Sequence, residues 1–206
     1  MQRILCKAIF VRMNEPQDPQ VHSLDARSLR GLAHPLRMRL LNALRRGGPA
    51  TASQLAAKLG ESSGATSYHL RQLAAYGFVE DAPEHGKGRE RWWKSVHMGV
   101  HFDEELFMDR DPEVRGAADV FMHELANQHT RELATWIGTR DDWSEAWRRA
   151  SDMSDWTLDL TPELALELNN KMHDLVESYR ALAPDDGTPD AEQVRVHTHI
   201  IPTRTD

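Results

Sequence analysis

The chain has 206 residues, of which 40% are hydrophobic and 28% are charged, values that fit one large globular domain or two small ones. No apolar run approaches the roughly 18 residues that a membrane span needs, and the N-terminus lacks the long apolar core and cleavage site of a signal peptide. The single cysteine, Cys6, excludes an intrachain disulfide and a multi-thiolate metal site, so we expect a cytoplasmic protein without membrane attachment.

The net charge of −7 conceals a strong asymmetry along the chain. Residues 25–97 hold 12 lysines and arginines against 6 acidic residues, whereas residues 98–206 hold 10 against 24. A basic part joined to an acidic part predicts an anionic partner for the first part only.

The beginning of the chain is polar, and four short helices follow it. Residues 14–23 contain two prolines and are expected to form a linker or disordered arm, so that residues 1–24 make a flexible arm or an added strand. Two helices are predicted between residues 25 and 48, with Pro35 in the first turn of the second. A third, capped by Thr51 or Ser53, ends at Gly60, and a fourth covers residues 62–76.

After the fourth helix the pattern changes to strands. "FVEDA" and "RERWWKSV" are strand-like and flank a polar, Gly-rich turn, which predicts a hairpin with a basic wing over residues 83–95. Two short helices separated by about four residues are typical of a helix-turn-helix. Residues 25–100 are therefore predicted to form a winged helix-turn-helix.

The remaining residues, 101–206, are predicted to be mostly helical. Periodic apolar residues indicate a long helix from about residue 112, a short helix around residue 146 and a third helix over residues 161–182. Alternation in "DWTLDL" and "VRVHTHII" predicts two strands. We expect a mainly α fold with a small β component, in which this half serves dimerisation, and the binding of an effector by the same half is left open.

A helical wheel separates the two faces of the fourth helix. Thr66, Leu70 and Leu73 fall on one side and are expected to pack on the other helices. The opposite side carries the residues expected to face outward, with His69 at the border: Gly64, Tyr68, Arg71 and Ala75, flanked by Ser63, Ser67 and Gln72.

An outward face of this composition suits the major groove of DNA. Arginine pairs bidentately with guanine, hydroxyl groups contact base edges or phosphates, and glycine permits close approach. The free backbone N–H groups at Ser62 and Ser63 are a phosphate site. A merely solvated helix face is the plainer alternative, and the basic residues of the wing, Lys87, Arg89 and Arg91, argue against it because they suit phosphates or a minor groove.

The order and spacing of these motifs resemble the arsenical-resistance-repressor (ArsR) family of bacterial winged-helix regulators. The resemblance covers residues 25–97, in "LAHPLRMRLLNALRRGGPATASQLAAKLG", "SSGATSYHLRQLAAYGFVE" and "GKGRERWWKS". It implies a dimeric regulator that places the fourth helix in the major groove, with Ser67 and Tyr68 facing DNA and His69 matching the histidine of the motif.

The sequence departs from the metal-sensing members of that family, because it has no thiolates near the third and fourth helices. His123 and His129 are six residues apart and cannot share a helix face, and His197 with His199 alone would not complete a site. We expect no metal, no cofactor and no catalytic residues, since no nucleophile–base pair or phosphate loop is recognisable.

Four tryptophans occur close together in the acidic half: Trp136, Trp143, Trp147 and Trp156. A core or a dimer interface is the simpler interpretation, and a pocket for a planar apolar effector is the alternative.

The sequence as a whole predicts a homodimeric transcriptional regulator that binds a pseudo-palindromic site on double-stranded DNA. The alternative is a winged-helix scaffold for protein interactions that does not bind DNA.

Overall fold

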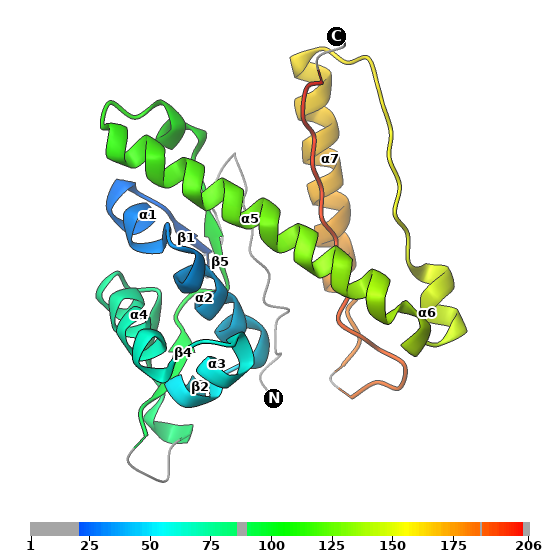
Figure 1. Cartoon of the computed structure of the whole chain (residues 1–206). Coiled ribbons are helices and arrows are strands. Elements are labelled where there is room, and N and C mark those ends of the chain that lie inside the picture. The colour runs from blue at the N-terminus through cyan, green and yellow to red at the C-terminus, as the bar shows by residue number, and fades with distance from the viewer. Residues whose placement is uncertain (1–20, 86–89, 186, 204–206) are drawn as a thin grey trace. The chain divides into compact units, whose positions relative to one another are not determined.

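The computed structural model describes residues 21–85, 90–185 and 187–203 (Figure 1). The chain divides into two compact units, an N-terminal unit that ends at Thr130 and a C-terminal unit that begins at Arg131. The predicted arm or strand at residues 1–20 lies outside the described residues.

Four helices open the N-terminal unit, and each begins where a side chain caps it. Asp25 accepts from the Ser28 N–H, and Thr51 accepts from the Gln54 N–H in a capping box. His34 caps the second helix, in which proline occupies the first position as predicted. The helices are α1 (Ala26–Leu32), α2 (Pro35–Gly47), α3 (Ala52–Leu59) and α4 (Ser63–Ala75).

The predicted hairpin follows α4. β3 (Val79–Asp81) pairs antiparallel with β4 (Trp92–Ser95), and a short 3-10 helix η1 (Pro83–His85) lies between them. The other side of β4 pairs with β2 (Ala50–Thr51), a two-residue strand before α3 that the sequence pattern did not reveal. The wing is therefore attached directly to the helix-turn-helix.

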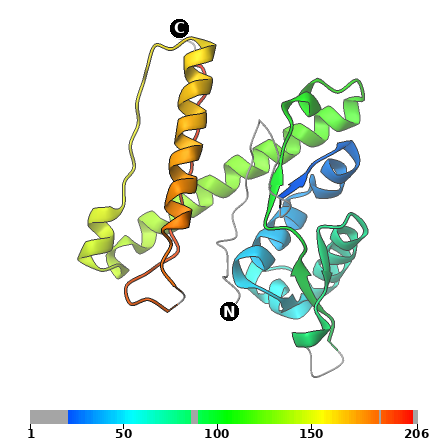
Figure 2. The ribbon, with the colours of Figure 1, turned by 180° about the vertical axis from the view of Figure 1, so that it is seen from behind.

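A second, two-stranded sheet includes residues 21–23, the end of the segment that was expected to be a linker or disordered arm. β1 (Val21–Ser23) lies beside β5 (Gly99–His101) and pairs with it in parallel (Figures 1 and 2). The Leu24 N–H donates to the His101 carbonyl at 2.9 Å. A three-residue strand is too short to show alternation, so pairing with a segment far along the chain decides its conformation.

The core of the N-terminal unit extends beyond the predicted boundary at residue 100. After the 3-10 helix η2 (Glu104–Met108), the long helix α5 (Pro112–Thr139) begins, as predicted. Val114, Ala118 and Phe121 of α5 are buried, and α5 also reaches α2 through a hydrogen bond between Gln128 and Asn42. The apolar residues that are less than 1% exposed are Leu29, Leu40, Leu44, Leu70, Leu73, Phe78, Ala82, Phe102 and Ala118.

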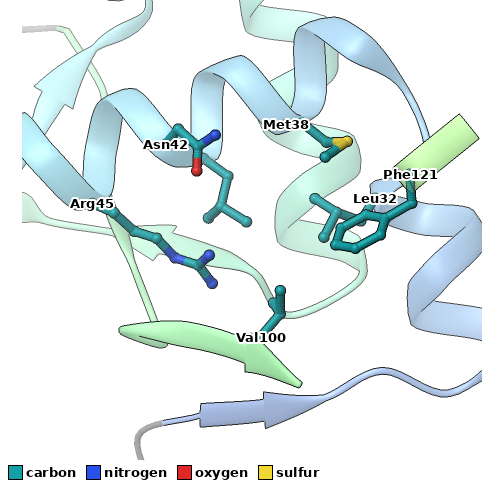
Figure 3. Close-up of a pocket in the computed structure, with 7 residues that line it drawn as sticks. Leu32, Met38, Asn42, Arg45, Val100 and Phe121 are labelled. Atoms are coloured by element: carbon teal, nitrogen blue, oxygen red, sulfur yellow. The ribbon is translucent and has the colours of Figure 1, made fainter. Parts of the chain in front are cut away.

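One cation is buried in this core. Arg45 of α2 is 2% exposed, and its Nε donates to the His97 carbonyl at 3.0 Å. Burial lowers the pKa of the guanidinium to about 9, so it remains charged at neutral pH. Figure 3 shows its side chain beside Asn42 and Val100, which line a cavity of about 10 Å³, room for one water molecule.

The C-terminal unit contains the end of α5, a 3-10 turn η3 (Arg140–Asp142), α6 (Glu145–Ala150) and α7 (Pro162–Ala181). The three α-helices were predicted, and η3 was not. The two predicted strands, residues 155–160 and 194–201, are wrong, since neither segment is part of a sheet. Residues 194–201 instead run in extended form alongside α7 (Figures 1 and 2), with Val194 and Val196 exposed. Alternation predicts a strand only where a neighbouring strand is present to pair with it.

The packing of α1 on the end of α4 depends on the absence of a side chain at Gly31. A Cβ at this position would lie 2.3 Å from the nearest carbon of the Tyr76 ring, which is far inside van der Waals contact. We predict that Gly31→Ala lowers the free energy of unfolding by about 1–3 kcal/mol, because the ring must move. Chemical denaturation checks this. The control is Gly116→Ala in α5, where the space is open, and where alanine should add up to about 1 kcal/mol. Equal stabilisation by both changes would contradict the packing.

Candidate DNA-binding surface

The rotation of α4 about its axis is fixed by the side chains that it buries. Thr66, Leu70 and Leu73 are fully buried against the neighbouring helices, as the helical wheel predicted. The Ser62 hydroxyl caps the helix by accepting from the Ala65 N–H at 3.2 Å. The opposite face therefore has to point away from the core.

The outward face carries the predicted residues. Gly64, Tyr68 and Arg71 are exposed, with Tyr68 at 54%, and no atom lies within 4 Å of a Cβ built on Gly64. The Arg71 side chain lies along the helix, where its Nε donates to the Ser67 carbonyl at 3.2 Å. Ser67 and Gln72 are half-buried at the edges of this face, and Ser62 and Ser63 are exposed at the helix start.

His69 has a different environment from Tyr68. Its ring lies 4.3 Å from the ring of His34, which caps α2 through its Nδ1 and the Leu36 N–H. Burial lowers the pKa of both imidazoles, and the nearby charge of Arg37 lowers both further. His69 therefore joins α4 to the start of α2, in a contact that favours two neutral rings.

A groove of about 410 Å³ lies between α4, the start of α3 and the wing. Its lining brings together residues far apart in the sequence: Thr51, Ala52, Ser53, Ser67, Arg71, Glu90, Arg91 and Trp93. Two predicted DNA-facing residues, Ser67 and Arg71, thus share a concave surface with Arg91 of the wing.

The described part of the wing is less basic than its sequence suggests. Arg91 forms a bidentate ion pair with Asp81. Its Cζ also lies 4.1 Å from the centroid of the buried Trp93 ring, over which the guanidinium stacks. Lys94 contacts Glu84 at 3.1 Å and Glu80 at 3.5 Å. These cations are held in place by acids of the same hairpin. Lys87 and Arg89 lie outside the described residues.

Ser53 and Glu90 are among the groove residues that were not predicted from the sequence. Ser53 of α3 donates to the Glu90 carboxylate at 3.2 Å, which places a negative charge beside Arg71 and Arg91. The N-terminal position of Ser53 in the third helix was a usable signal. Nothing in the sequence pattern indicated that Glu90 would face the groove.

The predicted effector pocket receives no support from the C-terminal unit. Trp156 is 75% exposed and Trp143 37%, and no ring contact joins any two of the four tryptophans in the described chain. Trp147 donates its indole N–H to the Asp190 carbonyl. Within the described residues, no group of three metal-ligating side chains occurs. Across the described residues of both units, no helix is long and apolar enough to cross a bilayer.

Residues 32–82 match the model of a family described as "Helix-turn-helix domain". Comparison with curated proteins finds no match. The family match confirms the predicted helix-turn-helix, and β2, β3 and β4 add the wing of the ArsR-like winged helix-turn-helix that the sequence resembles.

Several solved structures are similar to the chain. One is the homodimeric winged helix-turn-helix DNA-binding domain of a possible ArsR-family regulator from Mycobacterium bovis, with 19% identity, 52% of this chain and 77% of that chain covered, and a TM-score of 0.32. A possible transcriptional regulator for arsenical resistance has 25% identity, 62% and 97% coverage and a TM-score of 0.30. RV1404 from Mycobacterium tuberculosis has 17% identity, with 81% of this chain and 84% of that chain covered, and a TM-score of 0.31. TM-scores of this size do not establish a common overall fold.

The histidine contact predicts a pH dependence. The folded state binds protons at His34 and His69 less tightly than the unfolded chain does. The free energy of unfolding should therefore be highest above about pH 6.5 and fall as the pH drops below that value. Denaturation between about pH 7.5 and 5.5 checks this.

The control is a His34→Asn/His69→Gln double variant, in which asparagine preserves the helix cap. It should lose less stability over the same pH range. An unchanged pH dependence would show that this contact does not titrate.

Proposed function

We propose that the protein is a homodimeric transcriptional regulator that binds a pseudo-palindromic site on double-stranded DNA. The observation that carries this proposal is the outward face of α4, on which Gly64, Tyr68 and Arg71 stand clear of the core beside the wing. In a winged helix-turn-helix, this helix is the element that enters the major groove.

Each part of the surface has a distinct task in this proposal. Arg71 and Tyr68 reach base edges, and the absence of a side chain at Gly64 lets the helix backbone approach the groove. The N–H groups at Ser62 and Ser63 bind a phosphate at the helix start. Lys87, Arg89 and Arg91 of the wing neutralise phosphates nearby, which supplies affinity without sequence information.

Two recognition helices are needed to read a pseudo-palindrome, and a two-fold axis would set them about 34 Å apart. The acidic balance of residues 98–206 suits a half of the chain that joins two copies and stays away from DNA. The resemblance to dimeric regulators supports the same arrangement.

A protein-interaction scaffold is the second candidate, and the neutralised cations of the wing favour it. The exposed Arg71 and the positive balance of residues 25–97 favour DNA. A gel-shift assay with the DNA upstream of the protein's own gene separates the two, because a scaffold would show no shift at physiological salt.

Removal of the Tyr68 and Arg71 side chains should reduce the sequence specificity of DNA binding and leave the fold intact. We predict that Tyr68→Ala and Arg71→Ala each weaken binding to the selected site by about 1–3 kcal/mol, with an unchanged melting temperature, since both side chains are exposed. Fluorescence anisotropy measures the affinity. Arg110→Ala, an exposed arginine before α5, is the control. A double variant that footprints DNA like the wild type would refute the recognition face.

The carboxylate in the groove should oppose phosphate and contribute to base choice. Glu90→Gln removes a negative charge while retaining the hydrogen bond to Ser53. We predict tighter binding to random-sequence DNA, by roughly two- to tenfold, and a smaller ratio of specific to non-specific affinity. The matched control is Glu105→Gln in η2. Unchanged random-sequence affinity would place Glu90 away from the DNA.

A further inference from the structure

The described residues of the C-terminal unit form no buried core in a single chain. Between Arg131 and Thr203, none of the described residues is buried. Exposed apolar side chains are spread over the whole unit, from Ile137 at 50% to Ile201 at 72%. Ordering a chain costs conformational entropy that only buried surface offsets, so this unit needs a further surface to cover it.

One part of this apolar surface is a stripe on α7. On a helical wheel it occupies one narrow arc. Four of its members are well exposed, Leu164 at 49%, Leu175 at 60%, Tyr179 at 68% and, just beyond the helix, Leu182 at 72%, and Leu168 is half-buried. We name these five residues, Leu164, Leu168, Leu175, Tyr179 and Leu182, the α7 stripe. Leu166 lies on the opposite side of the same helix and is not part of it.

The spacing of the α7 stripe is self-complementary. Leu164 and Leu168 stand as far before its midpoint, between Lys171 and Met172, as Tyr179 and Leu175 stand after it. When two copies of α7 lie antiparallel, Leu164 meets the partner's Tyr179 and Leu168 meets the partner's Leu175. A two-fold interface requires a surface that matches itself in this way, and an unrelated partner does not.

The charges beside the α7 stripe also favour pairing with a second copy of α7. Lys171 and Asp174 lie on one edge of the α7 stripe, and Lys171 is oriented by its contact with Glu167 at 2.6 Å. Antiparallel pairing about the midpoint brings Lys171 close to the partner's Asp174, and symmetry repeats the pair.

We propose that α7 is a dimerisation helix that packs antiparallel against α7 of a second copy of this chain through the α7 stripe. This inference rests on the homodimer proposed above and names its contact surface, and it does not depend on DNA binding.

A first experiment compares two leucines of matched exposure. Leu164, in the stripe, is 49% exposed, and Leu166, on the other side of the helix, is 47% exposed. Sedimentation of the full chain should show that Leu164→Glu raises the dimer dissociation constant about tenfold or more, whereas Leu166→Glu leaves it unchanged. Circular dichroism checks that both variants keep their helices. Equal effects, or no effect, would overturn the proposal.

A second experiment tests the register directly. In a Cys6→Ser background, the Leu168→Cys/Leu175→Cys double variant should form a covalent dimer with a short bis-maleimide. Neither single variant should do so, because each new cysteine faces a leucine of the partner. A dimer that forms from either single variant, or from none of the three, would overturn the antiparallel pairing.

The outcomes also separate this inference from the proposed function. A dimeric wild-type chain, together with no cross-link in the Leu168→Cys/Leu175→Cys variant, would refute the α7 stripe and leave the homodimer standing. A monomeric chain would refute both. DNA affinity is measured independently by anisotropy, so loss of DNA binding with an intact cross-link would refute the regulator and not the dimer helix.

Discussion

The burial of three side chains of α4 is the constraint on which the rest of the surface depends. Thr66, Leu70 and Leu73 have almost no exposed area, and they lock the rotation of the helix against its neighbours. Since residues on one helix have fixed angular relations, this burial also determines which side chains point outward. The contact between His69 and His34 adds a polar link between α4 and the start of α2. The direction of Tyr68 and Arg71 is thus a consequence of core packing.

The wing shows a second constraint, which acts through charge. Arg91 pairs with Asp81 and Lys94 pairs with Glu84 within the hairpin. Arg91 also stacks on Trp93, a buried residue of β4. Pairs of this kind at the surface are weak, so phosphates can compete for the cations, at the expense of contacts that already exist. Direct pairing of β2 with β4 holds the wing at a fixed distance from α3. The groove with Ser53 and Glu90 results from this attachment, and under the proposed function base choice would depend on both elements.

The sequence predicted the elements whose signals are local. Helices α1 to α4 and α7 begin at capping side chains, glycines follow the ends of α2, α3 and α4, and the hairpin strands flank a Gly-rich turn; the structure confirms these elements. The sequence pattern did not predict β1, β2 and β5, because strands of two or three residues form only through distant partners. The opposite error occurred at residues 155–160 and 194–201, where alternation exists but no strand is available to pair. In the candidate site, the helical wheel placed Tyr68 and Arg71 correctly on the surface, whereas the position of Glu90 and the ion pairs of the wing depend on how the hairpin closes.

The most direct test of the account is selection of DNA fragments from a genomic library by the full-length protein at two salt concentrations. The account predicts enrichment of one inverted repeat, with half-site centres about 10 base pairs or a multiple apart, and a steep loss of retained DNA at the higher salt concentration. Retention of fragments without a shared motif, or no retention at either concentration, would contradict the assignment of α4 as a sequence-reading helix.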